Sequence, residues 1–428
     1  MLNGSVRLRL LVAFVAGVVG LALPFAAGAD DGADRTVVVL LFDGWAPSLL
    51  QSIPAPALDR MRREGAWTHK MLPAFPTISL VNQTTISTGC WPEHHGIVTN
   101  VFLDPSRGEY DHSHDADWLT GCEHLHQAAE RQGVRAAALG WVGRYSSTRG
   151  DLATYASSER NFAAFPSDPE RAEQVLEQLR LADDKRPRLI LAYFKGPDGA
   201  EHFKGMDSDE TRQAVIESDA CVGKILAGID ALAFRDRVTL IVTTDHGMIP
   251  VTHDVNISKI LLNHNIEAQY RSSGTTSFLY FADHNLIGRA FTELSGYKEF
   301  DVVRKDAQPA DWHLGTGPRV ADLILSTHPP YFIEDISRWP KWAHWLGTWG
   351  PEFLPATFAL KATHGYPADT PGVAGIFYVW GSGIAPAHEV ESIRAIDLHP
   401  TVTHLLGVAP GKQVDGQVAR KFLTPSLN

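Results

Sequence analysis

The sequence predicts an α/β fold in which helices flank a mostly parallel sheet. Short continuous apolar runs, as expected of strands buried on both faces, recur along the chain. Segments with the apolar period of a helix separate them. The chain of 428 residues is 44% apolar, which is enough for a sizeable core. Together these observations favour one large α/β domain or two modest ones.

The predicted elements can be taken in chain order. The first strand is TVVVLLF at 36–42, and the helix after it begins near Pro56 and ends at Gly65. Further strands are expected at 134–139, 188–194, 238–244, 276–281, 319–325 and 374–379, and further helices at 168–182 and 208–232. This alternation is typical of a parallel sheet sandwiched by helices. The stretch from about 250 to 360 is less regular, so we expect a small inserted subdomain or long loops there.

The N-terminal segment is typical of an export signal. Arg7 and Arg9 precede the apolar run LLVAFVAGVVGLALPFAAGA, and the small residues 27–29 fit a cleavage site. We therefore expect residues 1–29 to be removed on export, leaving 30–428 as a periplasmic or secreted protein with no permanent membrane span. An uncleaved membrane anchor is the alternative, because the run is long enough to cross a bilayer.

Charge and cysteine content narrow the classes of function. A formal net charge of −11 at pH 7 argues against a nucleic-acid polymer as partner. Three cysteines, Cys90, Cys122 and Cys221, cannot build a disulfide framework, so the fold must depend on its core. In an oxidising compartment one pair could bridge and one cysteine remain free. The sequence leaves that pairing open, as it does the oligomeric state.

Acidic and histidine residues follow the three strongest predicted strands. Asp43 follows TVVVLLF, Asp198 and His202 follow RLILAYF, and Asp245-His246 follow VTLIVTT. Ligands of open α/β sheets bind beyond the carboxyl ends of the strands, so we expect these side chains to converge. Asp oxygen and His nitrogen suit zinc, and two such ions close together form a clamp for phosphoryl transfer.

A further candidate ligand is His364, in KATHGYPADTPG just before the last predicted strand. A lone histidine there is more often a capping or core residue, and one Asp-Gly pair is usually a plain turn. Acidic groups at three separate strand ends nevertheless favour a shared metal site.

Four motifs occur in the order found in a known enzyme family. The densest is MLPAFPTISLVNQTTISTGCWPEHHGIVTNVFLDP at 71–105, and P-D-x-x-x-H, D-H-G-M and T-H-G-Y follow near 198, 245 and 363. The chain resembles the nucleotide pyrophosphatase/phosphodiesterase (type I phosphodiesterase) family of the alkaline phosphatase superfamily over nearly all of the mature part. The resemblance implies an alkaline-phosphatase-like catalytic core and a metal-dependent phosphoric diester hydrolase.

The same resemblance implies a role for each candidate residue. Ser79, the second hydroxyl of FPTIS, falls on the family's nucleophile, and Asn100 falls on an asparagine that hydrogen-bonds a phosphoryl oxygen. One Zn²⁺ would be held by Asp43, Asp245, His246 and the oxygen of Ser79. A second Zn²⁺ would be held by Asp198, His202 and His364. Mn²⁺ or Mg²⁺ could occupy such sites instead, because Asp and His ligands do not exclude them.

The chemistry implied is nucleophilic. Ser79 would attack phosphorus to form a covalent phospho-enzyme ester, which water then hydrolyses. Thr77 is the rival nucleophile. The remaining hydroxyls of the motif are expected to cap or line the following helix, and they belong to Thr84, Thr85, Ser87 and Thr88.

Departures from the family pattern bear on the substrate, which we expect to be a small-molecule phosphodiester. Leu80 and Val81 replace the usual aromatic and proline after the nucleophile, which lessens the expectation of a nucleotide. We recognise no arginine that would clamp a monoester dianion. Alternatives are a related hydrolase acting on phosphonates, phosphomonoesters or sulfate esters, and a non-catalytic envelope binding protein.

Two further stretches have alternative interpretations. DHSHDAD at 111–117, with Cys122, His124 and His126, is either an extra metal site or a solvated surface loop. RWPKWAHWLGTWG at 338–350 holds four tryptophans. They either pack a lid or the core of the insert, or form an apolar or choline-binding wall.

Overall fold

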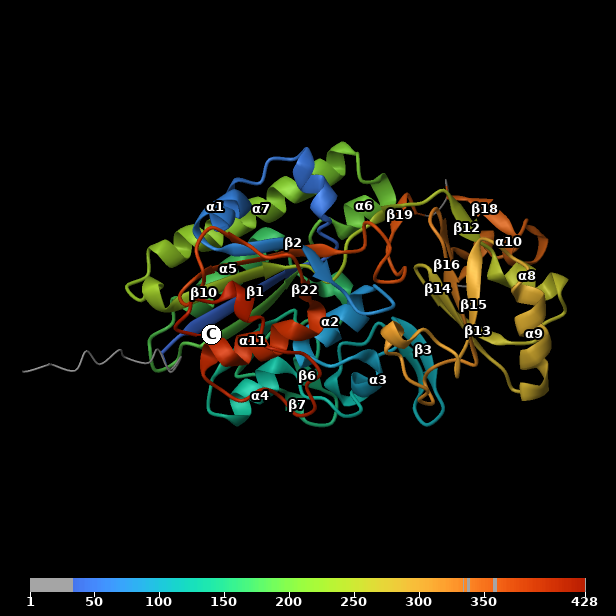
Figure 1. Ribbon diagram of the computed structural model, residues 1–428, viewed down its shortest axis with the longest axis horizontal. Coiled ribbons are helices and arrows are strands. Elements are labelled where there is room, and N and C mark those ends of the chain that lie inside the picture. The colour runs from blue at the N-terminus through green and yellow to red at the C-terminus, as the bar shows by residue number, and fades with distance from the viewer. Residues whose placement is uncertain (1–33, 334, 337–338, 357–359, 428) are drawn as a thin grey trace, which may run out of the picture.

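The structure is a computed structural model that describes residues 34–427 apart from 334, 337–338 and 357–359 (Figure 1). The predicted export signal at 1–29 lies outside the described residues. In the described part of the chain, no helix is both long enough and apolar enough to cross a membrane.

A nine-stranded sheet forms the centre of the larger lobe, in the order β21-β2-β20-β10-β1-β9-β5-β8 with β22 beside β2. Five neighbouring strands are parallel: β10 (Val238–Thr243), β1 (Thr36–Phe42), β9 (Leu189–Phe194), β5 (Ala136–Leu139) and β8 (Tyr155–Ala156). β20 (Gly375–Gly381) runs antiparallel to β10 and to β2 (Ala66–Leu72). The short strands β21 (His388–Glu389) and β22 (Ile393–Arg394) pair with β2 at the edge. The predicted, mostly parallel sheet is therefore confirmed, with one antiparallel strand in it.

Helices cover both faces of this sheet because each central strand is apolar on both sides. Along β1, Val37, Val39 and Leu41 point into one core, and Val38, Leu40 and Phe42 point into the other. Figure 1 shows the helices of the first core and of the second on opposite sides of the sheet. The first set is α2 (Ser79–Thr88), α4 (Leu125–Arg131) and α11 (Leu398–Leu406), and the second is α1 (Pro56–Glu64), α5 (Asp168–Leu179) and α7 (Asp209–Asp230).

A smaller lobe follows β10 in the chain and lies at one end of the molecule (Figure 1). Its antiparallel sheet has the order β13-β14-β16-β15. These strands span Gln269–Ser273, Thr276–Tyr280, Leu323–Thr327 and Phe300–Arg304, and they share a core with α8 (Ile257–Asn263) and α9 (Ile287–Leu294). Beside them, β12 (His253–Val255) pairs with β17 (Tyr331–Phe332) and β18 (Phe353–Pro355). The division of the chain into one catalytic domain with an insert stays a prediction.

The cysteine and histidine tract is exposed at Asp111 and His112 and buried at His114, His124 and His126. Among the described residues, the groups that could hold a metal ion contain none of these side chains. Cys90 and Cys122 form a disulfide, and Cys221 is free and buried in α7. His124 and His126 are buried, with His124 Nδ1 2.9 Å from Ser87 Oγ and His126 Nε2 2.8 Å from the carbonyl oxygen of Gly143. The surface-loop interpretation is wrong for these two histidines because both side chains are buried and contact Ser87 and Gly143.

Candidate active site

The structure brings the predicted ligand residues to one edge of the central sheet. Asp43 follows β1, Asp245 and His246 follow β10, and Asp198 and His202 lie on α6 (Asp198–Lys204) after β9. His364 follows β19 (Ala362–Thr363) and precedes β20. Because β20 is antiparallel, its beginning lies beside the end of β10, where Phe377 pairs with Thr243. His364 thus reaches the same edge as ligands that follow parallel strands.

The first group of ligand atoms surrounds the hydroxyl of Ser79. Ser79 Oγ is 3.1 Å from His246 Nε2 and 3.5 Å from Asp43 Oδ1. His246 Nε2 is 3.4 Å from Asp43 Oδ1 and 3.7 Å from Asp245 Oδ1. One atom from each of Asp43, Asp245 and His246 lies within 4.8 Å of the others, which is close enough for one metal ion to contact all three.

The second group lies beside the first. His202 Nε2 is 3.2 Å from Asp198 Oδ1 and 3.1 Å from His364 Nε2, and Asp198 Oδ1 is 3.6 Å from His364 Nε2. His246 also lies within 4.8 Å of the Asp198 and His364 atoms, and its ring stacks on that of His364 with centroids 3.5 Å apart. The two groups are therefore contiguous, with His246 between them.

Backbone carbonyls fix which nitrogen of each imidazole faces the cluster. Nδ1 of His202, His246 and His364 lies 2.8, 3.0 and 3.1 Å from the carbonyl oxygens of Ala362, Gly247 and Thr77. A carbonyl accepts only from a protonated nitrogen, so in its neutral form each ring directs the Nε2 lone pair into the cluster. Two such lone pairs facing each other across 3.1 Å, on His202 and His364, are the arrangement that a cation between them would stabilise.

The carboxylates fit a cation for the same reason. Asp198 Oδ1 is buried and accepts no hydrogen bond from the described residues. Burial raises the pKa of Asp43 well above its usual range, and the charges of Asp245 and Asp198 raise it further. Burial also raises the pKa of Asp245, whereas the attraction of His202 and His364 outweighs burial and lowers the pKa of Asp198. Three clustered acids, of which Asp43 and Asp245 are buried, beside three imidazoles form a donor set that suits divalent metal ions.

Ser79 and Thr77 have different surroundings although both belong to the FPTIS motif. Ser79 is the first residue of α2, and its hydroxyl lines a cavity. Thr77 is fully buried, where its hydroxyl donates to the carbonyl of Tyr366 at 2.9 Å and accepts from the N–H of Gly365 at 3.0 Å. The Thr77 hydroxyl is therefore part of the loop packing, and the Ser79 hydroxyl alone of the two faces a substrate-sized space.

Asn100 also lines this cavity. Its Oδ1 accepts from the N–H of Leu80 at 3.1 Å, so its amide nitrogen remains as a donor beside Ser79. The other hydroxyls of the motif, on Thr84, Thr85, Ser87 and Thr88, are buried within α2. The sequence interpretation of those four as ordinary structure is consistent with this placement.

Two residues that sequence reasoning missed hold the first group in place. Tyr193 donates its hydroxyl to Asp43 Oδ2 at 2.6 Å, and Gln83 Nε2 donates to Asp245 Oδ2 at 2.8 Å. Both bonds use the carboxylate oxygen that faces away from His246, so they orient the acids. Tyr193 lies inside a predicted buried strand, where the hydroxyl of a tyrosine needs a polar partner. A tyrosine in such a run could therefore have indicated a buried polar group next to the strand.

The cavity over the cluster has a volume of about 790 Å³ and reaches well beyond the ligands. Its outer wall includes Tyr145, Arg160 and Phe162. Arg160 is an arginine that the sequence analysis did not recognise. Its guanidinium pairs with Asp151 at 3.1 Å and lies over the Tyr145 ring at 4.3 Å, so it is already engaged in the wall.

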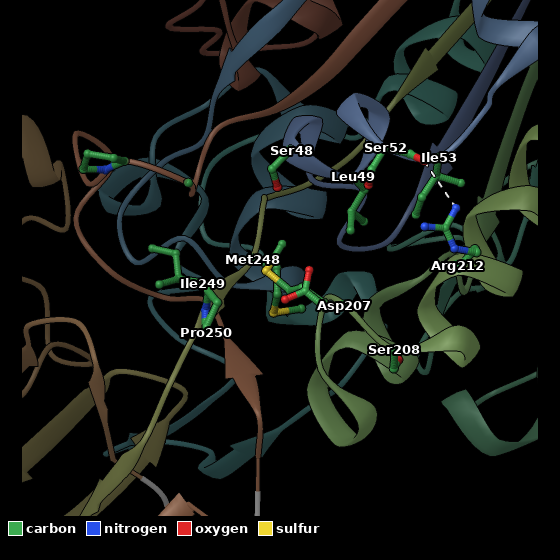
Figure 2. A pocket seen from close by; sticks show the side chains of 13 residues that line it. Ser48, Leu49, Ser52, Ile53, Asp207, Ser208, Arg212, Met248, Ile249 and Pro250 are labelled. Carbon is green, nitrogen blue, oxygen red and sulfur yellow. Dashed lines mark hydrogen bonds between the residues drawn. The ribbon is translucent and has the colours of Figure 1, made fainter.

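A second cavity, of about 630 Å³, lies outside the candidate site and contains none of the predicted ligands. Figure 2 shows Met248, Asp207 and Leu49 around it, with Arg212 hydrogen-bonded to the backbone of Ser52 at its side. We do not assign the active site to this cavity, because the cluster of titratable residues lines the other one.

Comparison with known proteins identifies the family of the chain. A family model described as type I phosphodiesterase/nucleotide pyrophosphatase matches residues 37–367. An uncharacterised pyrophosphatase/phosphodiesterase of Schizosaccharomyces pombe is 27% identical over 87% of this chain and 76% of its own length. Ectonucleotide pyrophosphatase/phosphodiesterase family member 7 of Homo sapiens is 25% identical over 96% of this chain and 88% of that protein.

A solved structure shares the fold. Murine ectonucleotide pyrophosphatase/phosphodiesterase 5, in an inactive form complexed with AMP, superposes with a TM-score of 0.79 at 20% identity. The match covers 91% of this chain and 100% of that one. The predicted α/β fold and the predicted enzyme class, a phosphoric diester hydrolase, are thereby confirmed. The chain belongs to the type I phosphodiesterase/nucleotide pyrophosphatase family.

Proposed function

We propose that the protein is a two-cation phosphodiesterase that uses Ser79 as its nucleophile. The observation that carries this proposal is the convergence of the Ser79 hydroxyl with Asp43 and His246 at the floor of a cavity, next to a second set of ligands. Asp43, Asp245, His246 and Ser79 would hold one divalent cation. Asp198, His202 and His364 would hold the other, with zinc the expected ion.

When bound, the cations would favour the ionised form of a hydroxyl and offset charge on the phosphoryl group and the departing oxygen. The chain's own residues place the reacting groups. The proton of Ser79 Oγ passes to water as Oγ forms a bond to phosphorus. The bond from phosphorus to the leaving alkoxide breaks, and the alkoxide takes up a proton from water and departs as an alcohol. Water then cleaves the serine ester, which restores the Ser79 hydroxyl and releases a phosphomonoester.

Two features beside Ser79 would stabilise the negative phosphoryl oxygens. Asn100 presents its amide nitrogen next to the nucleophile, because Leu80 occupies its carbonyl oxygen. Ser79 also lies in the first turn of α2, where free backbone N–H groups and the helix dipole favour an anion. These donors are fixed before the substrate arrives, so little reorganisation is needed during the reaction.

The cavity supports a diester substrate over a monoester. A monoester dianion carries an extra charge, and the one arginine of the cavity wall, Arg160, is paired with Asp151. Leu80 lines the cavity where an aromatic would stack on a base, so a nucleotide gains less there. A non-catalytic binding protein is disfavoured because every predicted ligand position carries a side chain that reaches the cluster.

Metal analysis and a substrate panel test the proposal. We expect about two zinc-type ions per chain and loss of activity in EDTA that Zn²⁺ restores. The catalytic efficiency kcat/KM should be higher for bis-p-nitrophenyl phosphate than for p-nitrophenyl phosphate. A metal content near zero with EDTA-resistant activity would defeat the two-cation site. A preference for the monoester would overturn the diesterase assignment.

We also propose that the protein is exported after cleavage near residue 29. The order of positive residues, apolar run and small residues supports this, as does the Cys90–Cys122 disulfide, since such bonds persist in oxidising compartments. N-terminal sequencing of protein from its native host should find a start near Asp30. A start at Met1 in the membrane fraction would contradict the proposal.

A further inference from the structure

We propose that three tryptophans of the smaller lobe form a surface that binds a zwitterionic phospholipid layer. The surface consists of Trp342, Trp345 and Trp349, and we call it the tryptophan face. It would hold the protein at a bilayer or mixed-micelle surface with the candidate active site nearby. The binding does not depend on catalysis, and only its consequence for the choice of substrate rests on the proposed function.

All three rings are turned toward solvent. Their exposed fractions are 71%, 56% and 80% for Trp342, Trp345 and Trp349. Helical backbone hydrogen bonds run through the segment, from Ala343 N to the carbonyl of Pro340 and from Trp349 N to that of Trp345. At helical geometry a spacing of three and then four residues places the side chains on one side. The expectation that these tryptophans pack a lid or core is therefore wrong for these three.

The backbone beneath the rings is held by the neighbouring helix. The segment includes α10 (Leu346–Trp349), which packs on α8, as Figure 1 shows at the end of the smaller lobe. Asn256 Nδ2 donates to the carbonyl of Leu346 at 2.8 Å, and Lys259 Nζ donates to that of Thr348 at 3.1 Å. Because these hydrogen bonds hold the backbone, the segment would lose little conformational entropy when the rings bind a surface. This favours a role in docking.

The composition of the face points to a lipid layer as its occupant. Tryptophan is enriched where proteins meet the headgroup region, because its ring is apolar while its N–H can donate to phosphate or ester oxygens. Residues 339–350 contain no acidic side chain, although the chain has 49 aspartates and glutamates. Lys341 and His344 are the titratable groups of that stretch. Absence of carboxylates suits a surface that presents phosphates outward.

Charge further selects the kind of lipid. The formal net charge of −11 would repel an anionic layer, so a zwitterionic one is favoured. The quaternary ammonium of a phosphocholine headgroup is also attracted to the face of a tryptophan ring. These two arguments agree on a phosphocholine surface.

The segment that carries the tryptophan face also borders the candidate active site. Trp339, three residues before Trp342, lines a cavity of about 350 Å³ together with the ligand residues His202 and His364. Phe203 lines the same cavity and is 64% exposed. An amphiphilic diester in a lipid layer would thus meet apolar side chains from the face to the cluster. If the proposed function holds, lipid-derived phosphodiesters are the substrate class that this arrangement favours.

Vesicle binding tests the proposal without relying on catalysis. The intact protein should sediment with phosphatidylcholine vesicles, and its tryptophan emission should shift to the blue. The variant W342A/W345A/W349A should lower the partition coefficient at least about tenfold. It should hydrolyse soluble bis-p-nitrophenyl phosphate as the unaltered protein does, which also shows that it folds. The matched control is I216A on α7, which removes another exposed apolar side chain, 40% exposed, from the larger lobe and should bind vesicles normally.

Several results would overturn the proposal. Failure of the unaltered protein to bind phosphatidylcholine, or equal binding by the triple variant, would do so. A concentration-dependent dimer that the triple variant loses, without vesicle binding, would assign the face to a second copy of the chain instead. Vesicle binding without hydrolysis of any phosphodiester would leave the tryptophan face standing and defeat the proposed function.

Discussion

Removing the hydroxyls of Ser79 and Thr77 one at a time distinguishes a catalytic role from a structural role within the FPTIS motif. S79A removes the atom that would attack phosphorus, together with an oxygen of the first ligand group. T77A removes a buried hydroxyl that links the FPTIS segment to the backbone of Gly365 and Tyr366. We expect the first variant to lose activity and keep its stability, and the second to lose stability and keep most of its activity.

The magnitudes follow from the surroundings of each hydroxyl. Without the Thr77 hydroxyl, the carbonyl of Tyr366 and the N–H of Gly365 both lose a partner in a buried place. Each unpaired group costs about 1–3 kcal/mol, so T77A should lower the free energy of unfolding by about 2–6 kcal/mol. Ser79 is partly exposed, so S79A should change that free energy by less than about 1 kcal/mol. Loss of a nucleophile lowers kcat by about 10⁴-fold or more.

Steady-state hydrolysis of bis-p-nitrophenyl phosphate and chemical denaturation measure the two effects on the same samples. T77S is the matched control, because serine keeps the hydroxyl and should recover most of the stability. Metal content must be measured for S79A, so that loss of a cation is not mistaken for loss of the nucleophile. If T77A lost activity at retained stability while S79A stayed active, the nucleophile would be Thr77 and the reasoning from burial would be refuted.

Three other changes probe the surroundings of the site. Burial lowers the pKa of His95 to about 3 and of His126 and His399 to about 4, below the value near 6.5 in the unfolded chain. The unfolded state therefore binds more protons below pH 6.5. In denaturation at several pH values, the free energy of unfolding should be highest above pH 6.5. It should fall by up to about 1.4 kcal/mol per pH unit for each histidine as the pH is lowered to about 4. A free energy of unfolding that does not change from pH 7 to 5 would contradict this. Y193F removes the hydroxyl that donates to Asp43, a proposed metal ligand, so chelator competition should show metal affinity reduced about 10- to 100-fold. L80F should raise kcat/KM for a nucleotide p-nitrophenyl ester about tenfold relative to bis-p-nitrophenyl phosphate, and an unchanged ratio would show that bases do not stack there.

The ligand-bearing strand ends were predictable because burial leaves a simple pattern in the sequence. β1, β9 and β10 are buried on both faces, so each appears as a continuous apolar run followed by an acid. β2 was missed because AWTHKML alternates buried and partly exposed residues next to the short strands of the sheet edge, with polar side chains between apolar ones. A half-buried strand of that composition resembles a loop by sequence pattern.

The sequence pattern could not predict the direction of a strand or the hydrogen-bond partner of a buried side chain. The apolar run of β20 fits either strand direction, and its antiparallel pairing with β10 appears only in the assembled sheet. The hydroxyl of Tyr193 donates to Asp43, which follows a different strand, so sequence spacing could not reveal this contact. The sequence offered two interpretations of the tryptophans of 338–350, packing in a lid or core and an apolar wall, because an apolar residue type does not say which way a short helical turn faces.

The FPTIS motif joins the two ligand groups through its backbone as well as its side chains. The carbonyl of Thr77 accepts from Nδ1 of His364, and Ser79, two residues later, contacts His246 and Asp43 of the first group. A shift of this short segment would therefore move the nucleophile and rotate a ligand of the second group together. Any substitution that loosens Thr77 should therefore lower the affinity of the second group for its cation, while activity measured with the cation in excess should be mostly retained. The dense hydroxyls of the motif thus divide into one that faces the substrate, one that fixes the His364 loop, and the others buried in α2.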